Sequence, residues 1–223
     1  MKAINLIVQS SVVLLDFDGV IVDSENWQIK AWNTAIEEMK ISIEGPISIA
    51  GILDEEIALS IAKSKSVANR LLQTKNKIFV RLFDGQNPPL VPGVLQFIKL
   101  YSKIGIIGVT SNSNKSRLMT ICEYYGLNKY LSIVEGARGK TAPKPSPEIY
   151  NLVLNKLKKS AAQAVAIEDS IPGLIAAKSA NVKAIGLPTS CLISDLIPKA
   201  DAVFESFDTL MHQWKELKTV KLD

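Results

Sequence analysis

The chain contains several short, wholly apolar runs, and the first of them ends directly in acidic residues. Val12 to Leu15 are all apolar, and Asp16 and Asp18 follow at once. Apolar runs of this length are typical of strands buried on both faces of a parallel sheet. Comparable runs occur at residues 105–109, 164–167 and 182–186, with a weaker one at 202–204. The sequence therefore predicts a core built on a parallel sheet.

Stretches with helical periodicity separate the apolar runs, at residues 93–101, 115–125, 146–158 and 171–180. Pro147 and Pro172 stand in the first turn of the last two, a position that helices favour for proline. Gly126 follows the second stretch, where a helix C-cap glycine would lie. We interpret the residues before Val12 as the lead-in to the first strand. The alternation of strands and helices predicts an α/β fold with a Rossmann-like parallel sheet.

One segment departs from this alternation. Residues 24–89 contain no strand-like run, whereas 27–39 and 55–83 are compatible with helices. Prolines and a glycine then punctuate the return to the alternating pattern. We therefore predict two domains: an α/β core formed by residues 1–22 and 91–223, and a small all-helical domain, residues 23–90, inserted after the first strand.

Composition and charge narrow the classes of function. Of 223 residues, 47% are hydrophobic and 22% charged, which is typical of a globular chain. The net charge of +4 comes from scattered Lys and Arg, so we expect a solvated surface and no nucleic-acid partner. No apolar stretch approaches the ~20 residues that span a membrane. Cys122 and Cys191 lie far apart, which favours a reducing compartment, and we expect a cytoplasmic monomer.

Polar residues follow three of the predicted strands. Asp16 and Asp18 follow the first, residues 110–112 (Thr-Ser-Asn) follow the second, and Glu168 and Asp169 follow the third. The functional crevice of an open parallel sheet lies outside the carboxyl ends of its strands. We therefore expect these three groups to meet at one edge, with Lys144, just before a predicted helix, within reach of it.

This set of residues suits phosphoryl transfer. Four carboxylates repel one another unless a cation lies among them, and all-oxygen ligands suit Mg²⁺. A lysine and hydroxyl donors would hold a phosphate group, which supplies the charge neutralisation that phosphoryl transfer requires. A carboxylate can attack phosphorus and form an aspartyl-phosphate. The single histidine, His212, lies far from every motif, which argues against a zinc site or a histidine-based hydrolase.

The motifs together resemble those of the haloacid dehalogenase superfamily, in the branch of β-phosphoglucomutase and phosphoglycolate phosphatase. The first motif is DFDGVIVDS, residues 16–24, and the second is VTSN, residues 109–112. The third is KPSP, residues 144–147, and the fourth is IEDS, residues 167–170, with Gly173. The four motifs occur in order, and the resemblance covers nearly the whole chain.

The resemblance implies a role for each matching residue of the first and fourth motifs. Asp16 is expected to be the nucleophile and a magnesium ligand. Asp18 is expected to be the general acid/base and to bind the metal through its backbone carbonyl. Glu168 and Asp169 are expected to complete the Mg²⁺ site.

The second and third motifs are expected to bind the phosphate group. Lys144 would pair with Asp16 and with the phosphate. Ser111 or Thr110 would donate a hydrogen bond to it, and the backbone amide of Asn112 would assist. In this family the inserted helical domain is a mobile cap that closes over the site and selects the substrate.

The cap departs from the mutase pattern. Gln28 stands where β-phosphoglucomutase-like members have a histidine, and glutamine does not titrate. Asp54, of opposite charge, stands where a cap arginine would follow the Gly51 turn, whereas Lys75 matches a cap lysine. Gln28 and Lys75 are therefore candidate substrate contacts in the cap. We expect a phosphatase of a small phosphorylated metabolite, of the sugar-phosphate type; the alternatives are a phosphomutase and a catalytically idle binding or regulatory protein.

Overall fold

The chain divides into two compact units. The computed structural model describes residues 1–45, 47, 49, 52, 54–82, 87–137 and 141–220, the last four by their backbone only; the Gly51 turn lies outside these ranges. The larger unit comprises Met1–Val22 and Leu90–Asp223, and the smaller unit is Asp23–Pro89. The domain boundaries expected from the sequence, after residues 22 and 90, lie within one residue of these limits.

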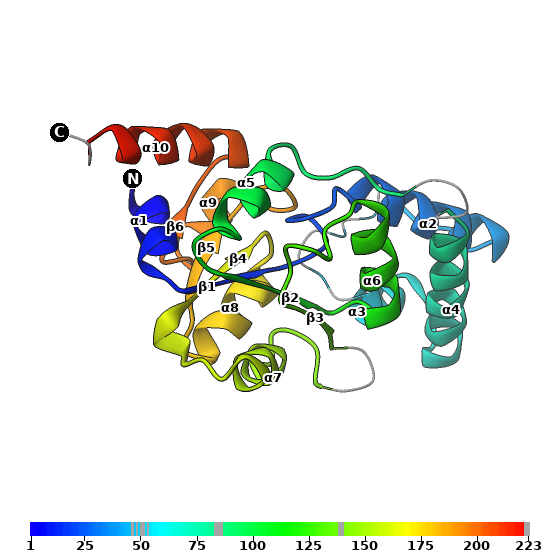
Figure 1. Cartoon of the computed structure of the whole chain (residues 1–223). Coiled ribbons are helices and arrows are strands. Elements are labelled where there is room, and N and C mark those ends of the chain that lie inside the picture. The colour runs from blue at the N-terminus through cyan, green and yellow to red at the C-terminus, as the bar shows by residue number, and fades with distance from the viewer. Residues whose placement is uncertain are drawn as a thin grey trace. The chain divides into compact units, whose positions relative to one another are not determined.

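A parallel sheet forms the centre of the larger unit (Figure 1). Its six strands run in the order β3-β2-β1-β4-β5-β6, and every pairing is parallel. The strands are β1 (Val12–Leu15), β2 (Ile106–Ser111), β3 (Ile133–Gly136), β4 (Ala164–Glu168), β5 (Lys183–Gly186) and β6 (Ala202–Val203). The predicted α/β fold with a Rossmann-like parallel sheet is therefore confirmed.

Strand β1 is apolar throughout because it is the central strand and is covered on both faces. All four of its residues are fully buried. At its carboxyl end, Leu15 pairs with Val109 of β2 on one side and with Ile167 of β4 on the other. The three strands therefore end side by side, so that the polar residues following each of them enter the same space.

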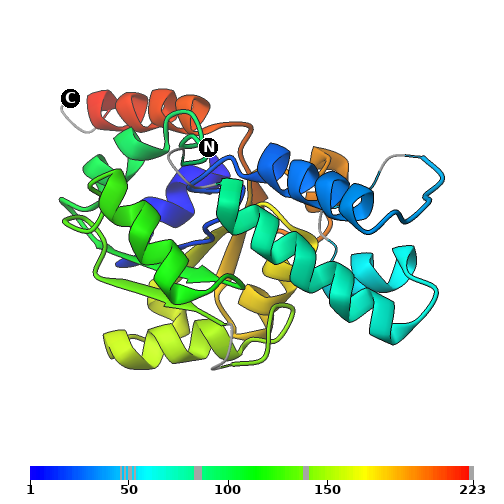
Figure 2. The same ribbon diagram turned by 90° about the vertical axis from the view of Figure 1, so that its right-hand side faces the viewer.

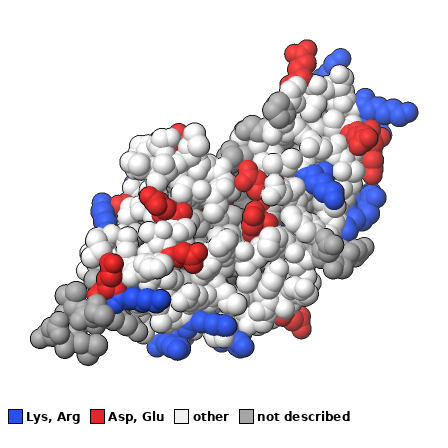
Figure 3. Space-filling model, turned by 90° about the horizontal axis from the view of Figure 1, so that it is seen from above, with Lys and Arg blue, Asp and Glu red and all other residues white. Residues whose placement is uncertain are grey.

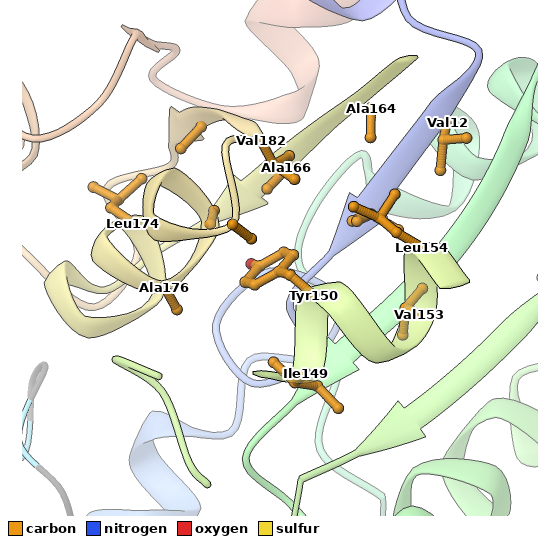
Figure 4. Packing of buried hydrophobic residues seen from close by; sticks show 14 of the residues in the cluster. Val12, Ile149, Tyr150, Val153, Leu154, Ala164, Ala166, Leu174, Ala176 and Val182 are labelled. Carbon is orange, nitrogen blue, oxygen red and sulfur yellow. The ribbon is translucent and has the colours of Figure 1, made fainter. Parts of the chain in front are cut away.

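Helices cover both faces of the sheet (Figures 1 and 2). On one side lie α7 (Glu148–Leu157) and α8 (Ile171–Ser179), and on the other α1 (Lys2–Gln9), α5 (Val94–Tyr101) and α10 (Phe207–Val220). The remaining elements of this unit are α6 (Lys115–Tyr124), α9 (Ile193–Leu196) and the 3-10 turn η1 (Ala161–Gln163). In Figure 4 the Tyr150 ring of α7 lies among apolar side chains of β4 and α8, which places its hydroxyl group inside the core.

The sequence analysis did not predict four elements of this unit, namely α1, β3, α9 and α10. The residues before Val12, which we interpreted only as the lead-in to the first strand, include Lys2–Gln9, which form helix α1. Ala3, Ile4 and Ile7 lie on its buried face, and the Met1 ammonium group donates to Gln213 of α10 at 3.2 Å. Strand β3 was not predicted, since only Ile133 and Val134 are apolar in it.

The smaller unit is helical. It contains α2 (Glu25–Glu38), α3 (Asp54–Ile61) and α4 (Lys65–Leu82), packed around a core that includes Trp32, Leu71 and Phe79. The stretch 55–83, which the sequence suggested as helix-compatible, is broken at residues 62–64. The Ser64 hydroxyl accepts a hydrogen bond from the Val67 amide at 3.3 Å, which is the N-cap interaction that starts α4.

The charged surface has no dominant sign on the face shown in Figure 3. Among the described residues, Lys and Arg side chains lie there singly or in small groups between acidic ones, which is typical of a solvated surface. Over the same described ranges, none of the helices combines the length and the apolar character that crossing a bilayer requires.

Candidate active site

Three acidic side chains meet at the carboxyl edge of the sheet. Asp16 follows β1, Glu168 ends β4 and Asp169 comes next, and all three are buried. One oxygen atom from each lies within 4.8 Å of one from the others. The structure thus brings together the residues that the strand-end pattern predicted, Asp16, Glu168 and Asp169.

Lys144 lies among these carboxyl groups, inside the protein. Its Nζ donates to Asp16 Oδ1 at 2.6 Å, to Glu168 Oε1 at 2.5 Å and to the Thr110 carbonyl at 2.9 Å. Its backbone amide donates to Asn112 Oδ1 at 2.8 Å. The Asn112 side chain therefore fixes the loop that carries Lys144, a role that the sequence did not suggest.

One ammonium group does not balance the charge of three carboxyl groups. Burial raises the pKa of Asp16, and burial together with the neighbouring Asp16 raises that of Asp169. Burial also raises the pKa of Glu168 to about 7, although Lys144 acts in the opposite direction. Burial would lower the pKa of Lys144, yet Asp16 and Glu168 raise it well above its usual value. The cluster therefore favours additional positive charge.

The donor set is suited to a hard divalent cation. Carboxylate oxygens are the ligands that Mg²⁺ prefers, and here three carboxyl groups converge. Glu168 Oε2 is buried and, among the described residues, has no hydrogen-bond partner. A buried carboxylate oxygen without a partner is energetically costly, and a bound cation would remove that cost. The residues present therefore fit a magnesium ion.

Two glycines allow these carboxyl groups to pack closely. A Cβ atom on Gly19 would collide with the Asp169 carboxyl group, and one on Gly173 would collide with that of Glu168. Gly19 also has a φ of +82°, a left-handed conformation that favours glycine. The glycines of the first and fourth motifs thus make room for the acidic cluster.

We predict that the metal-free protein loses stability as pH rises from 4.5 to about 7.5. The pKa of Glu168 is about 7 in the folded protein and 4.5 for an ordinary glutamate, so the folded protein holds a proton that the unfolded chain releases. The proton contributes on the order of 3 kcal/mol to the free energy of unfolding below pH 4.5. This contribution is lost as the pH rises through 7. Urea unfolding in chelator would measure it. The Glu168→Gln variant should flatten this part of the profile; a wild-type profile parallel to that of the variant would contradict the prediction.

The candidate phosphate donors end strand β2. Both Thr110 and Ser111 are buried. Ser111 Oγ accepts a hydrogen bond from the Ser113 amide at 3.0 Å, which leaves its hydroxyl proton available to donate. The Thr110 carbonyl is already bound by Lys144. The carbonyl contact does not involve the Thr110 hydroxyl group, so both residues remain candidate donors to a phosphate oxygen.

Asp18 lies apart from the Lys144 cluster and has its own partners. Arg117 Nη2 donates to Asp18 Oδ1 at 2.7 Å, and Ser113 Oγ donates to Asp18 Oδ2 at 2.8 Å. Arg117 lies in the first turn and a half of α6, immediately after the second motif. The sequence analysis predicted Asp18 but neither of these partners.

Sequence reasoning missed two further contacts of the acidic cluster. The Tyr150 hydroxyl donates to Glu168, and the Ser190 hydroxyl donates to Asp169. The strand-end rule, applied to β5 as well, would have pointed to Ser190, which lies in the loop after Gly186. No comparable signal marks Tyr150, because a tyrosine near a helix start is most often a core residue.

The two candidate residues of the cap, Gln28 and Lys75, lie in the smaller unit. Lys75 is buried, and its Nζ donates to Asp54 Oδ2 at 2.6 Å. The same Nζ lies 5.3 Å from the ring centroids of Trp32 and Phe79. Lys75 is thus an internally paired cation. Gln28 is partly buried on α2.

The fold and the acidic cluster define an α/β protein with a Rossmann-like core and a polar site at the carboxyl edge of its sheet. The chain belongs to the haloacid dehalogenase-like hydrolase family, whose sequence profile matches residues 13–187. The family expected from the four motifs is thereby confirmed.

Individual relatives include enzymes of two kinds. The chain is 27% identical over 221 residues to a bifunctional riboflavin kinase/FMN phosphatase of Arabidopsis thaliana, a match that covers 92% of this chain and 56% of that protein. The chain thus spans about half the length of this relative. It is also 27% identical over 225 residues to the beta-phosphoglucomutase of Bacillus subtilis (strain 168), covering 92% of this chain and 96% of that protein.

The fold is also found among solved structures. A haloacid dehalogenase-like family hydrolase from Streptococcus pneumoniae matches with a TM-score of 0.81 at 15% identity, over 92% of this chain and 99% of that one. At this identity the likeness concerns the fold alone.

Proposed function

We propose that the protein is a magnesium-dependent phosphatase of a small phosphorylated metabolite, of the sugar-phosphate type, acting through an aspartyl-phosphate on Asp16. The observation that supports this most directly is the buried Lys144 ammonium group bound to both Asp16 and Glu168, beside Asp169. Asp16, Glu168 and Asp169, with the backbone carbonyl of Asp18, would hold Mg²⁺. When bound, Mg²⁺ supplies charge neutralisation for the transferring phosphoryl group.

The proposed reaction has two displacements at phosphorus. In the first, an Asp16 carboxylate oxygen forms a bond to phosphorus while the bond to the substrate oxygen breaks, and Asp18 gives that oxygen its proton. In the second, a water oxygen bonds to phosphorus as the bond to Asp16 breaks, and Asp18 takes up the proton of the water. The products are the free alcohol and inorganic phosphate.

The remaining residues of the core unit would bind and orient the phosphoryl group. Lys144 holds Asp16 by the 2.6 Å contact, and the proposed ammonium–phosphate contact would offset negative charge on the transferring oxygens. Ser111 would donate its hydroxyl proton to a phosphate oxygen. The Asn112 amide would add a second donor, while the Asn112 side chain keeps the Lys144 loop in place.

Hydrolysis is favoured over mutase chemistry by the residues of the smaller unit. A mutase of this branch must bind a bisphosphate, and a second phosphate needs an available cation. Lys75 is already paired with Asp54 at 2.6 Å. Asp54 itself stands where the mutase pattern has an arginine. Gln28 cannot carry a proton as a histidine does. We therefore propose that the smaller unit acts as a cap suited to monophosphates with an uncharged distal part.

Replacing Asp54 by Asn is expected to improve the use of sugar bisphosphates relative to monophosphates. The substitution removes a negative charge that would repel the second phosphate and releases part of the Lys75 charge. We expect the KM for fructose 1,6-bisphosphate to fall about threefold to tenfold, since a charged hydrogen bond contributes ~1.5–3 kcal/mol at most. The Glu56→Gln variant, on the exposed side of the same helix, is the control. Equal KM changes in both variants would contradict the prediction.

The decisive experiment measures phosphate release from a panel of phosphorylated metabolites, with Mg²⁺ and with chelator. We expect release from monophosphates that requires Mg²⁺ and needs no added bisphosphate. Turnover of a hexose phosphate that starts only when a bisphosphate is added would instead identify a phosphomutase. Well-folded protein that binds Mg²⁺ but releases no phosphate from any substrate would identify an idle binding protein.

A further inference from the structure

A three-residue hydrogen-bonded set surrounds the Asp18 carboxyl group. Arg117 Nη2 donates to Oδ1 at 2.7 Å, and Ser113 Oγ donates to Oδ2 at 2.8 Å. Arg117 Nη1 donates to Ser113 Oγ at 2.9 Å and reaches Asp18 Oδ2 weakly, at 3.5 Å. Both carboxylate oxygens are therefore held from the direction of α6.

The setting of this group differs from that of a surface ion pair. The side chains of Arg117 and Asp18 are only 18% and 26% exposed, so their interaction is partly shielded from water. A guanidinium group on one carboxylate oxygen and a hydroxyl group on the other fix the plane of the carboxylate as well as its distance. Arg117 is itself carried by a capped helix, because the Asn114 side chain accepts from the Ser116 amide at 2.9 Å. The Asp18 carboxylate is thus held by a rigid element.

The contacts of Arg117 and Ser113 with Asp18 also bear on the repulsion between Asp18 and Asp16. Burial is the main reason that the pKa of Asp16 is raised, and the negative charge of Asp18 adds to it. Without a partner, the Asp18 carboxylate would be driven away from the acidic cluster by this repulsion. The Arg117 guanidinium group, 2.7 Å from Asp18 Oδ1, offsets part of this negative charge.

We propose that Arg117, assisted by Ser113, is a positioning residue that fixes the orientation in which the Asp18 carboxyl group meets the leaving-group oxygen. This inference rests on the proposed function, because it assigns to Asp18 the proton transfer of the phosphatase reaction. Arg117 itself does not touch the phosphate group in this scheme. Its removal should therefore affect the proton-transfer step and leave substrate binding unchanged.

Leaving groups of different basicity test this role. Phenyl phosphate and p-nitrophenyl phosphate have nearly the same shape, but p-nitrophenolate departs readily without a proton and phenolate does not. The second displacement also uses Asp18 and is the same for both substrates, so the comparison uses kcat/KM, which reports the steps up to the first displacement. In the Arg117→Met variant we expect kcat/KM for phenyl phosphate to fall about 10- to 100-fold, a part of the ~100- to 10,000-fold that general acid catalysis contributes. For p-nitrophenyl phosphate we expect kcat/KM to fall by less than about threefold.

Further variants separate positioning from folding. Arg117→Lys should recover part of the kcat/KM for phenyl phosphate, and Ser113→Ala should lose less of it than Arg117→Met. In an Asp18→Asn background, Arg117→Met should cause no further loss, because the two residues act as a unit. Lys183→Met, which removes an exposed partner of Asp201 at 3.2 Å, is the control for loss of a core-unit ion pair. Urea midpoints of all variants would verify folding.

Equal loss of kcat/KM with the two aryl phosphates, or a raised KM with unchanged kcat, would overturn the inference, since either would mean that Arg117 supports the fold or binds substrate. Wild-type protein that releases phosphate from neither compound nor from any metabolite would refute the proposed function instead. The two failures are therefore distinguishable.

Discussion

The Asp16→Asn variant is expected to release phosphate at least about 1,000-fold more slowly than the wild-type protein, a loss comparable with the removal of other catalytic nucleophiles. An amide oxygen is a poor nucleophile, so the first displacement at phosphorus cannot proceed. The acid-quenched wild-type enzyme should carry a phosphoryl adduct by intact mass during turnover, whereas the variant should carry none. Steady-state phosphate release from the best substrate of the panel gives the rate.

The same substitution is not expected to damage the fold. It removes one carboxylate from a cluster of three, and Lys144 keeps its contact with Glu168 at 2.5 Å. In chelator the variant should therefore unfold at a urea concentration at or above that of the wild type. Asp195→Asn, at an exposed position of α9, is the control. It should change neither the rate of phosphate release nor the urea concentration at which the protein unfolds. Retention of more than about a tenth of the activity by Asp16→Asn would place the nucleophile elsewhere.

The site residues that could be predicted from the sequence are those that directly follow or end buried parallel strands. A buried apolar strand followed by polar residues marks both the strand and its functional end. Asp16, Glu168 and Asp169 each follow or end such a strand, and the structure brings them together. Whether they perform the proposed roles is what the variants above test.

The missed parts depend on partners that are distant along the chain. Ser113 and Arg117 contact Asp18 across 95 and 99 positions, and nothing local in the sequence marks either of them. Helix α1 was missed for the same reason, because its apolar face packs toward α10 at the other end of the chain. Periodicity identifies an element, but it does not identify which distant element completes it.

Lys144→Met is expected to give the largest loss of stability, and the loss should be greatest when metal is absent. The substitution leaves the carboxyl groups of Asp16 and Glu168 buried without the ammonium group that now lies 2.6 and 2.5 Å from them. Removing one partner of a buried ion pair lowers the free energy of unfolding by about 3–5 kcal/mol. Urea unfolding in chelator would measure this loss, and we expect activity to fall about 1,000-fold as well.

Magnesium should restore part of the lost stability, because a cation that binds only the folded state stabilises it in proportion to its occupancy. The control is Lys156→Met, which removes one of two lysines paired with Glu135 and leaves Lys115 in place at 3.1 Å. That partly exposed pair should contribute about 1 kcal/mol or less. If Lys144→Met and Lys156→Met unfold alike in chelator, Lys144 does not offset the charge of the cluster, and the carboxyl groups must share protons instead. If Mg²⁺ stabilises the wild type and Lys144→Met by different amounts, the difference measures how far the lysine and the metal compensate the same charge.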